Sequence, residues 1–260
     1  MSETTNKDQP YRYFIDLSYD GGNFLGWQVQ PKGRTVQGEL IERLSTFFRD
    51  EIYVVGAGRT DAGVHASHMT AHFDLSSEIK STKDAVYKLN RFLDADIGLK
   101  RIYRVRKEAH SRFDAIERGY VYRLSRVKNP FSVGYAWQFE RQLDFAKMNE
   151  AASTLLEYSD FAAFCKADTD VKTTLCDVRE ARWEQLGHEW VFHIKADRFL
   201  RNMVRAIVGT LVAVGEGKIS VEEFRKIIES ENRRNAGSSA PGEGLYLSEV
   251  AYPSDIEWKE

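Results

Sequence analysis

The sequence predicts an α/β protein of the α+β kind, with two lobes whose sheets are mostly antiparallel. Its 260 residues are enough for two modest cores. Segments in which apolar residues alternate at period two are interleaved with segments in which they recur at helical spacing. The first half of the chain follows the order β-α-β-β-α-β, and the second half repeats this theme loosely. That order is typical of ferredoxin-like folds.

The first lobe is predicted to begin with a half-buried strand over 11–20, in which every second residue from Tyr13 to Tyr19 is apolar. Thr35 can cap a helix with an apolar stripe over 36–47. The same periodicities predict strands over 51–58, 69–75 and 98–105, and a helix over 82–93.

The second lobe is predicted to begin with a strand over 119–127, followed by a helix that Asp144 caps. Ser220 and Glu223 fit a capping box at the start of the last helix. The other predicted elements are a strand over 190–196, a helix from about Phe199 to Val214, a breaker-rich loop over 232–244 and a strand over 245–252. The expected organisation is a tail over 1–10, lobes over 11–107 and 108–252, and a tail over 253–260.

Composition places the chain among ordinary globular proteins, because 42% of its residues are apolar and 29% are charged. No apolar run approaches the roughly 18 residues that a membrane span needs. The first ten residues are polar, so we expect no signal peptide. Cys165 and Cys176 are the two cysteines, without CxxC spacing. This usage argues against a disulfide framework and a zinc module, and for a reducing compartment such as the cytoplasm.

The net charge of −2 hides an uneven distribution of basic residues. Between Lys100 and Lys128 there are ten Lys or Arg residues and three acids, with aromatic residues interleaved. Cations that neutralise phosphates, together with rings on which bases stack, are typical of a nucleic-acid surface. We therefore expect Arg101, Arg104 and Arg106 to contact nucleic-acid phosphates. The alternative is a solvated charged face, and the window alone leaves both open.

The stretch "VVGAGRTDAGVHA", residues 54–66, contains a carboxylate, Asp61, among three glycines. It is not a Walker loop, because Val64 and His65 stand where Lys and Ser or Thr must reach phosphates and metal. It is not a dinucleotide fingerprint either, because Asp61 stands where the third glycine belongs.

Asp61 is more consistent with a lone catalytic carboxylate on a glycine-rich loop after a buried strand. A metal cluster of Asp61 with His65, His68 and His72 matches no known ligand spacing, and we expect no metal. The remaining alternative is an aspartate that pairs with Arg59 or caps a turn.

The chain resembles the tRNA pseudouridine synthase A family over nearly its whole length. "AGRTDAGVHA" is similar to the family signature. Five further segments resemble family segments in the expected order: "DLSYDGGNFLGWQVQ", "RTVQGEL", "HSRFDAIERGYVYRL", "FLRNMVRAIVG" and "EGLYLSEVAYP". The resemblance implies isomerisation of uridines in the anticodon stem-loop of tRNA, at positions 38 to 40. It also implies RNA-recognition-like lobes around a basic central cleft, and a homodimer.

The resemblance implies a role for each matching residue. Asp61 matches the catalytic nucleophile, and Tyr120 matches the tyrosine that packs on the target uracil. Arg205 matches the arginine that pairs with the aspartate, and Arg59 matches the arginine that helps to displace the base. Leu245 matches an apolar pocket wall. For Tyr120, a core tyrosine is the alternative; Tyr122, two residues later, is the better candidate for that structural role.

The chemistry of pseudouridine formation fits these residue types and requires no cofactor. An ionised carboxylate can attack the base or the sugar, or act on a glycal species. In a partly desolvated pocket it needs a nearby cation, and Arg205 is the expected one. Arg198 and Arg201 precede it at helical spacing, so the three arginines are predicted to form one stripe of a helix that contacts RNA. A solvated basic face is the alternative for Arg198 and Arg201.

Two residues depart from the family pattern. Asp94 replaces a usual proline before "DI", and Lys172 stands where the family often has arginine, which puts a bidentate contact there in doubt. The competing function is a non-catalytic RNA-binding or tRNA-folding module. Asp61 distinguishes the two, because a pure binder has no use for a carboxylate that faces RNA.

Overall fold

A computed structural model describes residues 11–166 and 172–257, which form nine strands and five α-helices. Two compact units contain them. Unit 1 comprises residues up to Ile116 and those from Leu247 onwards, and unit 2 comprises Glu117–Tyr246. The predicted α+β class with mostly antiparallel strands is confirmed. The expected division into lobes over 11–107 and 108–252 stays a prediction.

Unit 1 has the predicted β-α-β-β-α-β order, and its strands follow the order β4-β1-β3-β9 with β2 against β3. The pairs of β1 with β3, β1 with β4 and β2 with β3 are antiparallel. The elements are β1 (Tyr11–Tyr19), α1 (Val36–Phe48), β2 (Val55–Gly56), β3 (His65–Leu75), α2 (Thr82–Phe92), β4 (Ile97–Arg104) and β9 (Leu245–Ala251).

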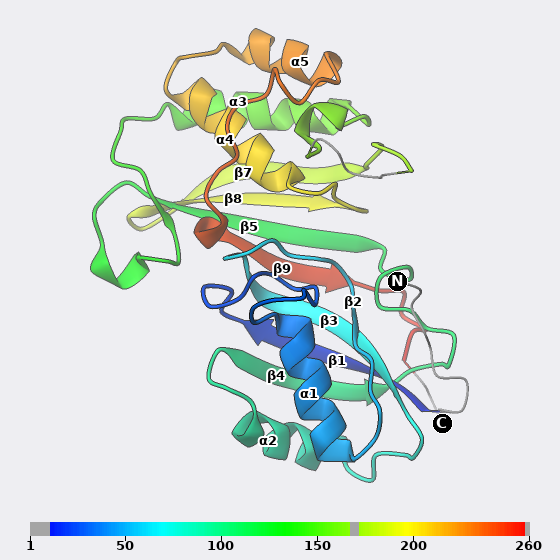
Figure 1. The fold of residues 1–260 in the computed structure, drawn as a ribbon. Helices are drawn as coiled ribbons and strands as arrows, with labels where there is room; N and C mark the ends of the chain where they lie inside the picture. The colour runs from blue at the N-terminus through cyan, green and yellow to red at the C-terminus, as the bar shows by residue number, and fades with distance from the viewer. Residues whose placement is uncertain (1–10, 167–171, 258–260) are drawn as a thin grey trace. The chain divides into compact units, whose positions relative to one another are not determined.

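The core of unit 1 lies on both faces of β1. On one face α1 crosses β1 and β3 (Figure 1), and Phe48 of α1 stacks on Phe73 with ring centroids 5.9 Å apart. On the other face Phe14 packs against Tyr103 and Tyr252 at 5.9 and 5.2 Å, and the buried Ile256 joins this cluster. The chain after β9 therefore contributes to the core of unit 1.

The strand expected over 51–58 is shorter than predicted, since only Val55 and Gly56 pair with β3. Side chains of α1 take the place of a ladder before it. The N–H of Ile52 donates to Oγ of Ser45, and the carbonyl of Val54 accepts from Nε2 of Gln37. The apolar alternation in this segment reflects burial against α1 rather than a long strand.

Unit 2 has the strand order β5-β8-β7, with antiparallel pairs, and β6 is parallel to β5. Helices α3, α4 and α5 pack against one another on the side of β7 (Figure 1). The elements are β5 (Glu117–Ser125), β6 (Trp137–Gln138), α3 (Phe145–Thr154), β7 (Val178–Leu186), β8 (Glu189–Ala196), α4 (Met203–Gly215) and α5 (Val221–Glu229).

The predicted helix caps are confirmed. Thr35 and Asp144 accept from Gly38 and Lys147 at the starts of α1 and α3, and Ser220 forms a complete capping box with Glu223. No helix among the described residues is both long and apolar enough to cross a bilayer.

Candidate active site

Asp61 lies on the loop over 57–64 of unit 1, which connects β2 to β3. Its side chain is half-buried, and Arg59 is exposed. The carbonyl of Asp61 accepts from the N–H of Val64 at 3.2 Å, which closes a turn with Gly63 at φ +73°. A positive φ at this turn position favours glycine. The turn keeps the backbone of Asp61 in a defined conformation while its side chain remains accessible.

A second segment, Gly21–Trp27, packs directly against this loop. The N–H of Trp27 donates to the carbonyl of Thr60 at 3.0 Å, and the N–H of Gly63 donates to the carbonyl of Phe24 at 3.4 Å. A Cβ on Gly21 would lie 2.0 Å from the carbonyl oxygen of Val64. These contacts hold the chain on both sides of Asp61, so "YDGGNFLGW" supports the loop. The sequence predicted a strand over 11–20, but it gave no signal that the segment after this strand contacts the Asp61 loop.

The histidines near the loop have structural contacts. Nδ1 of His65 accepts from the N–H of Gly21 at 3.0 Å and lies 3.1 Å from Oδ1 of Asp20. Nδ1 of His72 lies 2.8 Å from Oγ of Ser111. Burial lowers the pKa of His72 to about 2, with a further contribution from the charge of Arg12, so this imidazole is neutral. Within 11–166 and 172–257, no group of three His, Cys, Asp or Glu side chains could hold a metal ion.

Tyr120 and Tyr122 lie on β5 of unit 2. Tyr120 is half-buried and packs edge-on against Phe199 at 5.1 Å, so part of its ring is accessible. Tyr122 is fully buried, and its hydroxyl donates to the carbonyl of Pro241 at 3.0 Å. The prediction that Tyr122 has the core role is confirmed.

Arg205 lies on α4 and fastens the loop that precedes β9. Its Nε donates to the carbonyl of Ala240 at 2.8 Å, and the N–H of Ala240 donates back to the carbonyl of Arg205 at 2.9 Å. Burial raises the pKa of Tyr122, and the positive charge of Arg205 opposes that rise. Arg205 therefore has a fixed, half-buried position close to Tyr122.

The predicted helical stripe of three arginines is wrong. Helix α4 begins at Met203, because Asn202 adopts φ 64°, a left-handed conformation that cannot continue a helix backwards. Arg198 and Arg201 thus lie in the segment between β8 and α4, half-buried and exposed respectively. Only Arg205 is helical.

Leu245 is buried at the start of β9, directly after Gly244. A Cβ on Gly244 would lie 2.7 Å from the ring of Tyr122 and 2.8 Å from the carbonyl oxygen of Arg123. The chain therefore reaches Leu245 by passing closely over β5, the strand that carries Tyr120. Tyr120 is thus part of β5, and the chain just before Leu245 packs on the same strand.

The three arginines that were expected to contact phosphates, in the basic window between Lys100 and Lys128, are paired with distant acids. Arg101 forms an ion pair with Glu257. Nη1 of Arg104 lies 2.7 Å from Oε1 of Glu78, and Nη1 of Arg106 lies 3.3 Å from Oδ2 of Asp255. The guanidinium of Arg101 also lies over the ring of Tyr103 at 3.9 Å. These ion pairs offset part of the excess of basic residues that is counted along the sequence.

The departures from the family pattern have separate environments. Asp94 lies 2.7 Å from Arg34, whose guanidinium also reaches Asp96. The loop before β4 is thus fastened by ion pairs rather than by a proline. Lys172 is exposed.

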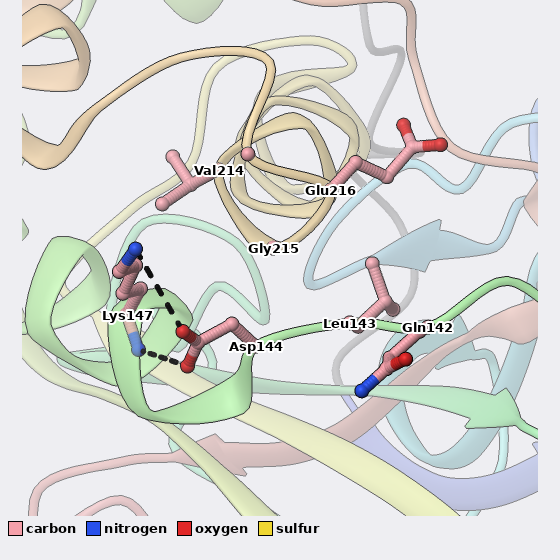
Figure 2. A pocket seen from close by; sticks show the side chains of 8 residues that line it. Gln142, Leu143, Asp144, Lys147, Val214, Gly215 and Glu216 are labelled. Atoms are coloured by element: carbon pink, nitrogen blue, oxygen red, sulfur yellow. Dashed lines mark hydrogen bonds and ion pairs between the residues drawn. The ribbon is translucent and has the colours of Figure 1, made fainter.

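A hollow of about 390 Å³ in unit 2 is separate from every predicted site residue. Figure 2 shows its lining from the start of α3 and the end of α4, with Lys147 beside Asp144. Asp144 caps α3, and its own N–H donates to the carbonyl of Gly215. These contacts account for the hollow as the junction of two helix ends.

Comparison with known proteins identifies the family of this chain. The family model described as tRNA pseudouridine synthase matches residues 151–253, which include Arg205 and Leu245. The tRNA pseudouridine synthase A of Bacteroides fragilis is 54% identical over 94% of this chain and 98% of that protein. The corresponding proteins of Porphyromonas gingivalis and Bacillus subtilis are 52% and 40% identical, over 94% and 91% of this chain and 98% and 97% of theirs. The chain belongs to the tRNA pseudouridine synthase A family.

Proposed function

We propose that this protein isomerises uridine to pseudouridine in the anticodon stem-loop of tRNA, at positions 38 to 40. Membership of the family supports the reaction and the substrate class. The observation that carries the assignment to particular residues is the Asp61 loop, a half-buried carboxylate on a chain held firmly on both sides. A loop fixed by a rigid scaffold is a common location for a catalytic group.

The reaction is an internal rearrangement. The C1′–N1 bond of the uridine breaks, the uracil turns while it stays bound, and a C1′–C5 bond forms. The proton on C5 is lost and N1 gains one, so atoms and electrons balance without a co-reactant. Asp61 acts as the nucleophile, which divides one difficult step into two easier ones.

The other predicted residues bind the substrate. Tyr120 packs on the target base, which must leave the helical stack at a cost of a few kcal/mol. The partial exposure of Tyr120 supports this role. Arg59 and Arg205 supply positive charge for the carboxylate and the RNA, and Leu245 provides an apolar wall.

The competing function is a module that binds or folds tRNA without modifying it. The support that the Asp61 loop receives argues against this alternative, because binding alone does not require a carboxylate held in one position. RNA phosphates favour cations instead.

We further propose that the protein acts as a cytoplasmic homodimer and that tRNA binds in a basic central cleft. The free thiols of Cys165 and Cys176 are consistent with a reducing compartment. Sedimentation of the purified protein at micromolar concentration tests the dimer, and fractionation of cells tests the location.

The assignment of activity is tested with unmodified tRNA made by transcription. After incubation with the protein, pseudouridines are mapped at nucleotide resolution. We expect them in the anticodon stem-loop and nowhere else in the tRNA. Stable binding without any pseudouridine would support the competing module instead.

A further inference from the structure

The hydroxyl groups of Tyr19 and Thr60 form a buried pair directly beside the candidate nucleophile. Tyr19 is 4% exposed at the end of β1, and Thr60 is 7% exposed and immediately precedes Asp61. Their Oη and Oγ1 atoms are 2.8 Å apart and share a hydrogen bond. A buried hydroxyl without a partner is costly, so this bond defines the orientation of both side chains.

Tyr19 links the loop to the rigid centre of unit 1. In the sheet Tyr19 pairs with Ala66 on β3 and with Ile97 on β4. Its position is therefore set by two neighbouring strands, and its hydroxyl is a fixed point from which Thr60 is held.

Thr60 is held from a second direction through its backbone. Its carbonyl accepts from the N–H of Trp27 at 3.0 Å, and a Cβ on Gly26 would lie 2.5 Å from the same oxygen. The ring of Trp27 in turn lies 6.2 Å from that of Tyr19. The side chain and the carbonyl of Thr60 are thus both fixed, which leaves little freedom for the next residue, Asp61.

We infer that Tyr19 is a positioning residue for the isomerisation. Its hydroxyl acts through the hydroxyl of Thr60 to hold the carboxylate of Asp61 in the position from which it reacts with the substrate. This inference rests on the proposed function. It assigns to the hydrogen bond between Tyr19 and Thr60 a role in the rate of the chemical step rather than in the affinity for tRNA. An error of about 1 Å in the position of a reacting group can cost about 100-fold in rate.

The test compares two buried tyrosines of the same strand. Tyr13 is 1% exposed on β1, and its hydroxyl accepts from the N–H of Ile79 at 2.9 Å, away from the loop. Tyr19→Phe and Tyr13→Phe each remove one hydroxyl from unit 1 and should lower the thermal midpoint by similar amounts. Tyr19→Phe should lower kcat about tenfold with KM within twofold. Tyr13→Phe should leave kcat unchanged.

Thr60 gives a second, independent variant pair. Thr60→Val keeps the shape and loses the hydroxyl, so it should lower kcat as much as Tyr19→Phe does. Thr60→Ser keeps the oxygen and should recover most of that loss. Because both changes break one bond, Tyr19→Phe combined with Thr60→Val should be no slower than either variant alone.

Three results would overturn the inference: a kcat for Tyr19→Phe within twofold of the wild type, equal losses in Tyr19→Phe and Tyr13→Phe, or losses that multiply in the double variant. The wild-type protein distinguishes this failure from that of the proposed function. If the wild type forms pseudouridine but the variants show one of these results, only the positioning role is wrong. If the wild type forms none, the proposed function itself fails.

Discussion

Asp61 and Arg205 are held in different ways. Asp61 lies on an irregular loop whose conformation depends on hydrogen bonds and close contacts from the segment Gly21–Trp27. Arg205 lies on a regular helix. The loop over 232–244, which precedes β9 and is called the return loop below, is hydrogen-bonded to Arg205 through Ala240. In unit 1 the surrounding chain positions the proposed nucleophile. In unit 2 the side chain of Arg205 positions the surrounding chain.

This difference predicts which neighbours matter for each residue. Glycines that allow close approach should be essential around Asp61, because a backbone shift moves the carboxylate directly. Around Arg205 the helix supplies the position, so neighbours that fasten the loop should affect stability more than turnover. Each of the following variants tests one part of this comparison.

The largest effect is expected for Gly26→Ala. Gly26 has φ +96°, and its Cβ would lie 2.5 Å from the carbonyl oxygen of Thr60. The substitution strains the backbone and displaces the loop, so kcat should fall by about 100-fold or more. The matched control is Gly187→Ala, which shares a positive φ of 62° but has open space around the added carbon. It should lose about 1 kcal/mol of stability and keep its activity. Equal activity in the two variants would contradict the claim that the segment over 21–27 holds the Asp61 loop in position.

A smaller loss is expected for Arg205→Leu. Removing a charged hydrogen-bond donor from the site should lower kcat/KM by about 10- to 100-fold. Arg233→Leu is the control, because Arg233 also donates to carbonyls of the return loop, those of Ala236 and Gly237. Both variants should lose comparable stability, and Arg233→Leu should retain turnover. If both lose turnover equally, Arg205 acts by fastening the loop and not through its charge.

The salt dependence of tRNA binding should separate paired from unpaired arginines. Arg101, Arg104 and Arg106 each have a carboxylate partner. Among the described residues, no carboxylate is paired with the side chain of Arg198 or Arg201. Each phosphate contact contributes about 0.7 to 0.9 to the slope of log affinity against log salt. Replacing Arg198 and Arg201 with Gln should therefore flatten the slope by about 1.4 to 1.8, and the triple replacement should flatten it by less than about 1. Titrations at several salt concentrations measure both slopes, and a larger change in the triple variant would reverse this assignment.

The smallest effect concerns stability in acid. The pKa of His72 is lowered from 6.5 to about 2 by burial, so below pH 6.5 the unfolded chain takes up a proton that the folded chain excludes. The free energy of unfolding should therefore fall as the pH drops from 6.5 to 5, by roughly 2 kcal/mol from this residue. His72→Gln should flatten that dependence. His193→Gln in unit 2 should flatten it less, because burial also lowers the pKa of His193 but its side chain is partly exposed. Urea titrations at several pH values compare the slopes, and parallel slopes for His72→Gln and the wild type would contradict the account.

Much of the fold could be predicted from the sequence, because the periodicity and the caps are local signals. The order of elements in unit 1 and the caps Thr35, Asp144 and Ser220 follow from neighbouring residues. Strand β7 was not predicted, and a register irregularity explains why. Its pairing shifts between Val178 and Glu180, so the buried residues are 178, 181 and 183 and the period of two is lost.

The site could be predicted only where its signal was local. Asp61 is conspicuous because no familiar loop chemistry accommodates a carboxylate at that point in the glycine pattern. Tyr120, Arg205 and Leu245 were assigned through the family resemblance. The ion pair of Arg101 with Glu257 joins residues 156 positions apart, and the bond between Tyr19 and Thr60 joins residues 41 apart. Contacts across such separations form only in the folded chain, so the periodicity of a single segment cannot predict them.

The central claim is that Asp61 reacts with the uridine and does not merely help to bind tRNA. The most direct measurement compares Asp61→Asn with the wild type on unmodified tRNA, recording both affinity and pseudouridine formation. Asn keeps the size of the side chain and removes its charge. The account predicts an affinity within a few-fold of the wild type and a loss of turnover of at least about 1,000-fold. Turnover near that of the wild type, or a loss of affinity that accounts for the whole effect, would contradict it.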